Sequence, residues 1–470
     1  MVATLATVTA VFIFANPVGA QTADTQYVLD NLWVFMAGVL VFFMQAGFAL
    51  VEAGMTRAKN VSNIMAKNIA DAGVGILAFW AVGFAFAYGG DHWLIGTSRF
   101  FLSGESLFGL TQGLSPATEF FFQSVFAATA VTIASGAMAE RTKFSSYIAF
   151  SLFMTAVIYP VAVHWTWGGG LVSRINIMGA TYSDFAGSSV VHGVGGMAAL
   201  VGAWKLGPRI GRYNDDGSVN EIPGHSMALA VLGVFILWFG WFGFNPGSEL
   251  AADDFVVFVA LNTLLAACAG MVAATALNWF RTGVPSIAMA ANGTLAGLVA
   301  ITAGAGTVNT FGAVSIGFLA GLLVVLAIAF FDRIRIDDPV SAISVHGVSG
   351  AWGTLAIGLF ARYDDAFLGR ANAGLFYGGG VAQLIVQALV VLILFSFAAV
   401  ASYIVFSAID RLMGLRVPAE DEIIGLDITE HGGPGYSLDQ TVLGLGAPAT
   451  TVGTTISLET HESHETITVT

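Results

Sequence analysis

Apolar stretches of membrane-spanning length occupy most of this chain, and they constrain its fold more than any other feature. Each is near the ~20 residues that a helix needs to cross ~30 Å of hydrocarbon. Eleven follow one another, at residues 28–54, 63–89, 117–138, 144–168, 185–206, 225–246, 254–281, 285–304, 309–331, 340–361 and 373–409. The sequence therefore predicts an all-α polytopic membrane protein with eleven transmembrane helices.

The composition agrees with a membrane protein and excludes several other classes. Apolar residues make up 56% of the 470 residues and charged residues only 10%, too few to cover the surface of a soluble globule. A net charge of −13 excludes a nucleic-acid-binding protein, and the composition disfavours a soluble enzyme. Cys268 is the only cysteine, so we expect no intrachain disulfide and no cysteine metal cage.

The two ends of the chain are treated apart from the membrane domain, which is expected over residues 27–410. Residues 1–20 are apolar and uncharged, and Val18 and Ala20 fit a cleavage site after Ala20, which predicts a signal peptide. Because no Lys or Arg precedes the apolar run, a retained hydrophobic segment is the alternative. Residues 411–470 are expected to form a cytoplasmic C-terminal tail.

Basic residues are divided unevenly between the two alternating sets of loops, which predicts the orientation. Of the seventeen Lys and Arg residues, thirteen are assigned to one set, including Lys67 near the start of the second span. The other set holds only Arg99, Arg174, Arg362 and Arg370. The richer set is predicted to be cytoplasmic. The protein is thus expected in the cell (inner) membrane with its N-terminus outside and its C-terminus in the cytoplasm.

Two copies of one motif reveal an internal repeat. The fifth span opens with Asp184-x7-His192-Gly-Val-x-Gly, and the tenth opens with Asp338-x7-His346-Gly-Val-x-Gly. Because the copies lie five spans apart, they cross the membrane in opposite directions. This predicts an inverted repeat of spans 1–5 and 6–10, with the substrate path at their interface and span 11 outside the repeat.

The repeat predicts that His192 and His346 approach each other near the middle of the membrane. Asp184 and Asp338 stand at helix-capping positions, and each histidine lies eight residues further, ~12 Å along a helix. Ionisable groups at this depth are costly, so a symmetric pair favours a functional role over a packing role. Zinc is the rival explanation, but it prefers three or four ligands and no third ligand has a matching place, so no metal is expected.

Aromatic residues gather near the outer ends of spans 3, 4 and 6. Phe122 and Phe126 are four residues apart and share one helical face. Aromatic faces attract cations, although Trp at a membrane interface is also a common anchor. With an apolar lumen and two histidines beyond them, these residues predict a path for a small cation that must lose its charge or hydration. The set comprises Phe122, Phe126, Trp167, Trp241, Phe244 and, beside them, Ser248.

These residues make the chain resemble the ammonium transporter (Amt/Mep/Rh) family, and most closely its bacterial and archaeal Amt branch. The resemblance extends over about Tyr27 to Tyr436. It is carried by Asp184-Phe-Ala-Gly…His192-Gly, Trp238-Phe-Gly-Trp-Phe-Gly-Phe-Asn-Pro-Gly-Ser248, Gly136-Ala-Met-Ala-Glu-Arg141 and Gly425-Leu-Asp-Ile-Thr-Glu-His-Gly432. It implies a homotrimer whose subunits each have a hydrophobic pore, and a protein that is not an enzyme and has no cofactor.

The resemblance also implies a role for each site residue. Ammonium would be recruited at the outer mouth by Phe126, Trp167, Ser248, Trp241 and Asp184. The pore would be gated by a stacked pair, Phe122 and Phe244, and lined by the twin histidines, His192 and His346. Two departures bear on the shape of the mouth: Pro246 stands where the family often has alanine, and the stretch 171–183 is longer than in some relatives.

The expected function is ammonium transport, with methylammonium as an analogue of the substrate. Ammonium would lose its proton at the gate, and ammonia would pass the histidines with or without that proton. The resemblance further implies that a PII-type signal protein docks at the cytoplasmic face. Two alternatives stay open. An Rh-like neutral gas channel would not need the aromatic-and-serine site, and an ammonium sensor predicts an appended signalling domain, which does not follow the last span.

Overall fold

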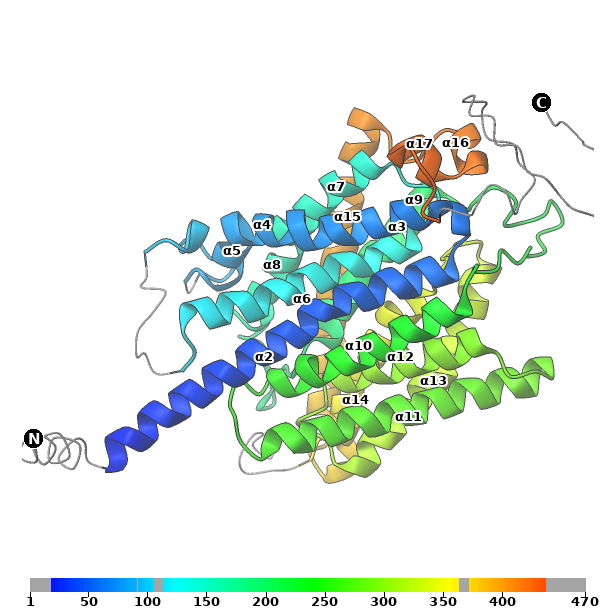
Figure 1. Cartoon of the computed structure of the whole chain (residues 1–470). Helices are drawn as coiled ribbons and strands as arrows, with labels where there is room; N and C mark the ends of the chain where they lie inside the picture. Colours follow the sequence, from blue (N-terminus) through cyan, green and yellow to red (C-terminus); the bar gives the residue numbers. More distant parts are fainter. Residues whose placement is uncertain (1–17, 91, 105–112, 363–371, 437–470) are drawn as a thin grey trace, which may run out of the picture.

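The computed structural model describes residues 18–90, 92–104, 113–362 and 372–436, with the backbone alone for residues 18–24. The helices lie alongside one another as a bundle, with the start of α2 at one end and α16 and α17 at the other (Figure 1). We call the end that carries α16 and α17 the tail side and the opposite end the far side. The long helices are α2 (Val18–Met55), α6 (Pro116–Ala137), α10 (Met227–Gly247), α11 (Phe255–Thr282), α12 (Ile287–Thr302), α13 (Thr310–Arg333) and α15 (Ala382–Met413).

Four spans consist of several helical pieces that are joined by π-helical turns. The second contains η1 (Ala58–Asn60), α3 (Val61–Ala70), η2 (Asp71–Gly75), α4 (Ile76–Ala78), η3 (Phe79–Gly83) and α5 (Phe84–Tyr88). The others are α7 (Phe144–Phe153) with η5 (Met154–Ile158) and α8 (Tyr159–Thr166), η6 (Ser188–Gly193) with α9 (Val194–Leu206), and η7 (Ile343–Val348) with α14 (Ser349–Phe360). The short elements are η4 (Phe100–Leu102), β1 (Asn176–Ile177), β2 (Ala180–Thr181), η9 (Leu375–Tyr377), α16 (Ala419–Ile424) and α17 (Leu426–His431).

Each of the eleven expected spans coincides with a helical segment. Within the described part of the chain, nine helices are long and apolar enough to cross a membrane, and α12 is a shorter apolar helix. Two details of the prediction were wrong. The last span begins at Ala382 rather than at residue 373, and Lys67 lies buried inside α3 rather than in a loop. α2 already begins at Val18, and residues 1–17 of the expected signal peptide lie outside the described residues.

The packing between helices follows the inverted repeat. α2 packs against α6, as its counterpart α10 packs against α12, and α2 and α10 pack against each other. Likewise, α6 packs against α9 and α12 packs against α14. At the centre, α9 contacts η7 while α14 contacts η6. These reciprocal contacts place the two histidine motifs at the interface between the repeats.

Ion pairs and hydrogen bonds between charged side chains connect the loops of the tail side. The Arg209 guanidinium donates hydrogen bonds to both carboxylate oxygens of Asp337, at 2.8 and 2.9 Å, and to Glu140 at 2.9 Å. Arg57 donates to the same Glu140 oxygen at 3.0 Å. Burial would raise the pKa of Asp337, but hydrogen bonds from Arg209 and the charges of Arg141 and Arg209 outweigh burial and lower that pKa to about 2. The cluster thus joins the loops that follow spans 1, 3, 5 and 9.

Candidate transport path

Asp184 and Asp338 hold the first turns of the two helices that carry the histidines. The Asp184 carboxylate accepts hydrogen bonds from the backbone N–H groups of Gly187 at 2.7 Å and Ser188 at 2.9 Å. The Asp338 carboxylate accepts one from the N–H of Ile343 at 2.7 Å. These bonds satisfy backbone donors that the start of a helix leaves free. Both aspartates therefore cap their helices.

The two capped helices cross closely because each has a glycine at the crossing. A Cβ atom on Gly196 would lie 2.4 Å from the backbone nitrogen of Gly347, and one on Gly350 would lie 2.3 Å from the carbonyl oxygen of Ser188. Gly196 and Gly350 are the last glycines of the two motif copies. Any side chain at either position would push the helices apart, so the glycines allow the histidine rings to meet.

His192 and His346 contact each other at the centre of this crossing. Their Nδ1 atoms are 3.1 Å apart, and the rings stack with centroids 5.2 Å apart. His192 is fully buried, and His346 is 5% exposed. One Nδ1 must donate and the other accept, so the contact holds a single proton between the two rings. Both histidines lie in π-helical turns, η6 and η7, which are frequent at functional sites and are not predictable from this sequence.

Three phenylalanine rings continue the path from the histidines toward the far side. Phe244 lies over His192 with ring centroids 5.3 Å apart, and it stacks on Phe126 with centroids 4.1 Å apart. Phe126 in turn contacts Phe122 at 4.7 Å. All three rings are almost fully buried, so they close the path at this level. The sequence-based choice of Phe122 as the stacked partner of Phe244 was wrong, because that partner is Phe126.

The residues expected at the mouth occupy three different positions. Trp241 is fully buried and stacks on His192 at 5.3 Å, so it lies beside the histidines rather than at the mouth. Trp167 is half-buried at the end of α8, and its Nε1 donates to the carbonyl oxygen of Asp184 at 2.9 Å. Ser248 ends α10, and its hydroxyl donates to the carbonyl oxygen of Phe244 at 2.8 Å. The longer stretch 171–183 forms the β1–β2 hairpin.

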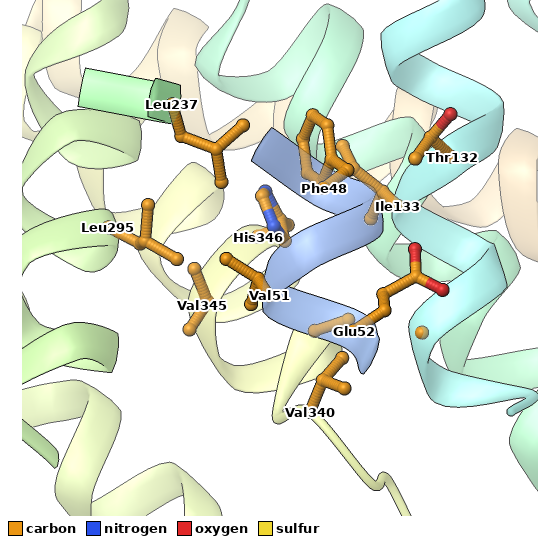
Figure 2. Close-up of a pocket in the computed structure, with 12 residues that line it drawn as sticks. Phe48, Val51, Glu52, Thr132, Ile133, Leu237, Leu295, Val340, Val345 and His346 are labelled. Carbon is orange, nitrogen blue, oxygen red and sulfur yellow. The ribbon is translucent and has the colours of Figure 1, made fainter. Parts of the chain in front are cut away.

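A narrow cavity continues from His346 toward the tail side (Figure 2). α2, α6, α10, α12 and η7 surround it, and most of its lining is apolar, including Phe48, Leu237 and Leu295. The centre of a water-sized molecule has about 20 Å³ available, which is enough for one such molecule. Glu52 and Thr132 are the polar residues that line it besides His346. The cavity therefore suits a small neutral molecule that can also exchange a proton.

A buried charged network lies beside this cavity and was missed from the sequence. Glu52, Lys67 and Asp71 are each at most 2% exposed. The Ser135 hydroxyl donates to Glu52 at 2.7 Å, and the Tyr147 hydroxyl donates to Asp71 at 2.6 Å. The signal was present in the sequence, because these three charged residues fall in or beside the first two apolar stretches, where ionisable groups are rare.

Comparisons with known proteins agree with this architecture. The Ammonium Transporter Family model matches residues 32–436. The chain is 46% identical to the ammonium transporter Amt2 of Archaeoglobus fulgidus, over 90% of this chain and 92% of that protein. It is 41% identical to the ammonium transporter Amt1 of Haloferax mediterranei, over 91% of this chain and 82% of that protein.

Solved structures give the same result. A sensor Amt protein is 40% identical and superposes with a TM-score of 0.80, over 87% of this chain and 99% of that one. Candida albicans Mep2 is 27% identical and superposes with a TM-score of 0.75, over 85% and 88% of the two chains. The chain belongs to the ammonium transporter family and is a multi-pass membrane protein that transports ammonium.

Proposed function

We propose that ammonium is recruited on the far side by Phe126, Trp167 and Ser248, and loses its proton beside the stacked rings of Phe126 and Phe244. Ammonia then passes His192 and His346 into the cavity of the tail side. The continuous run of rings from Phe122 to His346 is the observation that carries this proposal. It leaves little room for the hydration shell of an ion, and it ends at the one pair of imidazoles that are in contact among the described residues.

The chemistry of ammonium explains why the path needs these groups in this order. Aromatic faces and a hydroxyl oxygen replace part of the hydration shell of the cation. Beyond them, buried apolar surroundings penalise a charge strongly, so the neutral form is favoured. A neutral gas channel would not need the cation-binding residues. The stacked rings and Ser248 therefore favour an ammonium transporter over an Rh-like channel. An ammonium sensor differs from both in that it would transport little ammonium.

Ser248→Ala is expected to raise the ammonium concentration for half-maximal transport about fivefold to tenfold, in keeping with the loss of one hydrogen bond of about 1 kcal/mol. The Ser248 hydrogen is already donated to Phe244, so the oxygen is free to accept from a cation that can only donate. Uptake measured against ammonium concentration tests this. Ser315→Ala is the control, since Ser315 makes the same bond to Phe311 on an exposed face. An unchanged half-maximal concentration would remove Ser248 from the recruitment site.

The orientation proposed here places the tail side in the cytoplasm. A C-terminal reporter that works only in the cytoplasm is expected to be active, and one that works only outside the cell should be silent. The physical reason is the excess of basic residues in the loops of the tail side. When Lys67 is assigned to a helix, twelve Lys and Arg residues remain in the loop set of the tail side, against four in the loop set of the far side. The opposite reporter result would reverse the assignment of every loop.

Removing residues from Gly425 onward is expected to lower transport severalfold without unfolding the spans. In α17, the buried Asp427 carboxylate accepts a hydrogen bond from the N–H of Asn63 at 3.0 Å, and the N–H of Leu426 donates to Asn60 at 3.0 Å. The tail thus holds the start of α3, the helix that contains Lys67. Asp427→Ala should reproduce the loss, whereas Glu420→Ala on the exposed side of α16 should not. Undiminished uptake by the shortened chain would contradict a role for the tail.

Two assembly expectations rest on the family resemblance and stay predictions. We propose a homotrimer, and we propose that a PII-type signal protein docks on the tail side. The cluster of Glu140, Arg209 and Asp337 supports the second proposal only indirectly, because it holds the loops of that surface in one arrangement.

A further inference from the structure

Glu52 is a buried carboxyl group on the wall of the path, and it belongs to a cluster that contains two acidic groups and one basic group. It lines the cavity together with His346 and Thr132 (Figure 2). One of its oxygens, Oε2, accepts a hydrogen bond from Ser135 at 2.7 Å and lies 4.0 Å from the Lys67 ammonium. The other oxygen, Oε1, is buried and has no hydrogen-bond partner among the described residues. A protonated carboxyl group would have its hydrogen on such an oxygen.

Glu52 and Asp71 share a single buried cation, the ammonium group of Lys67. Lys67 donates to the carbonyl oxygen of Ser135 at 2.9 Å, so its ammonium stays beside Glu52. Asp71 follows Lys67 along the same span, interacts electrostatically with it and is also fully buried. Two carboxylates and one ammonium carry a net charge of −1. Burying an uncompensated charge costs several kcal/mol, so the cluster is neutral when it holds one additional proton.

Within this cluster, access to the cavity favours Glu52 as the carrier of that proton. The two carboxyl groups are bonded alike: Asp71 accepts from Tyr147 at 2.6 Å, Glu52 accepts from Ser135 at 2.7 Å, and each has one buried oxygen without a partner among the described residues. Glu52 lines the cavity and Asp71 does not, so a proton that arrives along the path reaches Glu52. The other titratable groups in range are His346 on the cavity wall, and Glu140 and Arg141 in the loop after α6.

We propose that Glu52 is a proton-exchange site on the path, at which ammonia leaving the histidine pair regains a proton. This rests on the proposed function above. Ammonia takes the proton of the Glu52 carboxyl group: an N–H bond forms, the O–H bond breaks, and ammonium and carboxylate result. The proton released by ammonium crosses from His192 to His346, and a water molecule in the cavity then returns it to the Glu52 carboxylate. The net charge carried is one per ammonium.

Glu52→Gln removes this exchange while leaving Lys67 and Asp71 as a balanced pair, so the variant should fold. We expect the ammonium-evoked current of proteoliposomes to fall at least tenfold at an unchanged melting temperature. Glu52→Asp keeps a carboxyl group and should retain most of the current. A purely structural role predicts instead that current and melting temperature change together, and that Glu52→Gln, with nearly the same shape, is the milder variant. Wild-type current in Glu52→Gln would overturn the proposal.

Infrared difference spectra between acidic and alkaline samples test the proton site without any transport. The wild type should show a carboxylic-acid band that is absent from Glu52→Gln. Asp71→Asn leaves Glu52 in place but removes the surplus negative charge, so the band at neutral pH should be lost there too. If Glu52→Gln does not fold, Asp71→Asn still tests whether Glu52 holds the proton. A carboxylic-acid band that persists in Asp71→Asn at neutral pH would overturn the proposal. A wild type that transports no ammonium would refute the proposed function, while the spectra would still judge the proton site.

Discussion

His192→Ala and His346→Ala are each expected to lower the ammonium-evoked current at least tenfold, with expression and melting temperature close to those of the wild type. Each variant removes the 3.1 Å contact between the two Nδ1 atoms and leaves one imidazole without its partner. The proton that the pair holds between its nitrogens is then lost from the path. Current and protein amount should be measured on the same preparation. His92→Ala is the control, because His92 is exposed and far along the chain from both helices of the pair.

The same two variants separate a functional pair from a structural one. An apolar replacement at membrane depth is not intrinsically costly, so the variants should fold. If the wider lumen admits water, potassium will also carry current, and selectivity will fall together with coupling. A structural role predicts low expression and normal transport by the protein that survives. Wild-type current and unchanged selectivity in both variants would exclude a functional pair.

Arg209→Ala is expected to destabilise the folded protein by about 3–5 kcal/mol, the usual cost of removing one partner of a buried ion pair. Arg209 is 3% exposed and bonds to Asp337 and Glu140, so its loss leaves two buried carboxylates without their shared cation. Thermal unfolding in detergent measures the effect. Arg333→Ala changes an exposed arginine near the same loop and should cost under about 0.5 kcal/mol. Equal melting temperatures for both variants would contradict a stabilising cluster.

The pH dependence of stability provides a second test of the same cluster. The pKa of Asp337 is about 2, below its ordinary value of 3.8. A lowered pKa stabilises the folded state above about pH 4, and the contribution disappears as the pH falls toward 2. At ~1.4 kcal/mol for each pKa unit, it amounts to roughly 2 kcal/mol. Between pH 4 and pH 2, the stability of the wild type should therefore fall more steeply than that of Arg209→Ala. Parallel curves would contradict this origin of the shift.

The sequence predicted the parts of the site that depend on position along a helix. The spacing from Asp184 to His192, repeated from Asp338 to His346, fixed the depth of both rings, because the rise of a helix is constant. The inverted direction of the two copies then predicted that the rings approach each other. The aspartate caps belong to the same motif and were predicted with it, whereas the close helix crossing at the last glycines of the motif was not predicted.

The parts that were missed depend on how one helix is rotated and shifted against another. Phe122 and Phe126 share a helical face, and only the register between α6 and α10 decides which of them reaches Phe244. The Glu52 network was missed for a different reason. Lys67 was placed in a loop because loop boundaries are uncertain by several residues, and a lysine in a loop needs no partner. Placed inside the helix, it requires nearby carboxylates, which Glu52 and Asp71 provide.

Uptake and current recorded together on proteoliposomes after an ammonium pulse test most directly whether this path carries ammonium. We expect uptake that saturates with ammonium concentration, competition by methylammonium but not by potassium, and one charge moved for each ammonium taken up. Vesicles with the His192→Ala protein should show neither signal at wild-type size. Uptake no greater than that of protein-free vesicles, or equal currents with ammonium and potassium, would contradict ammonium transport along this path.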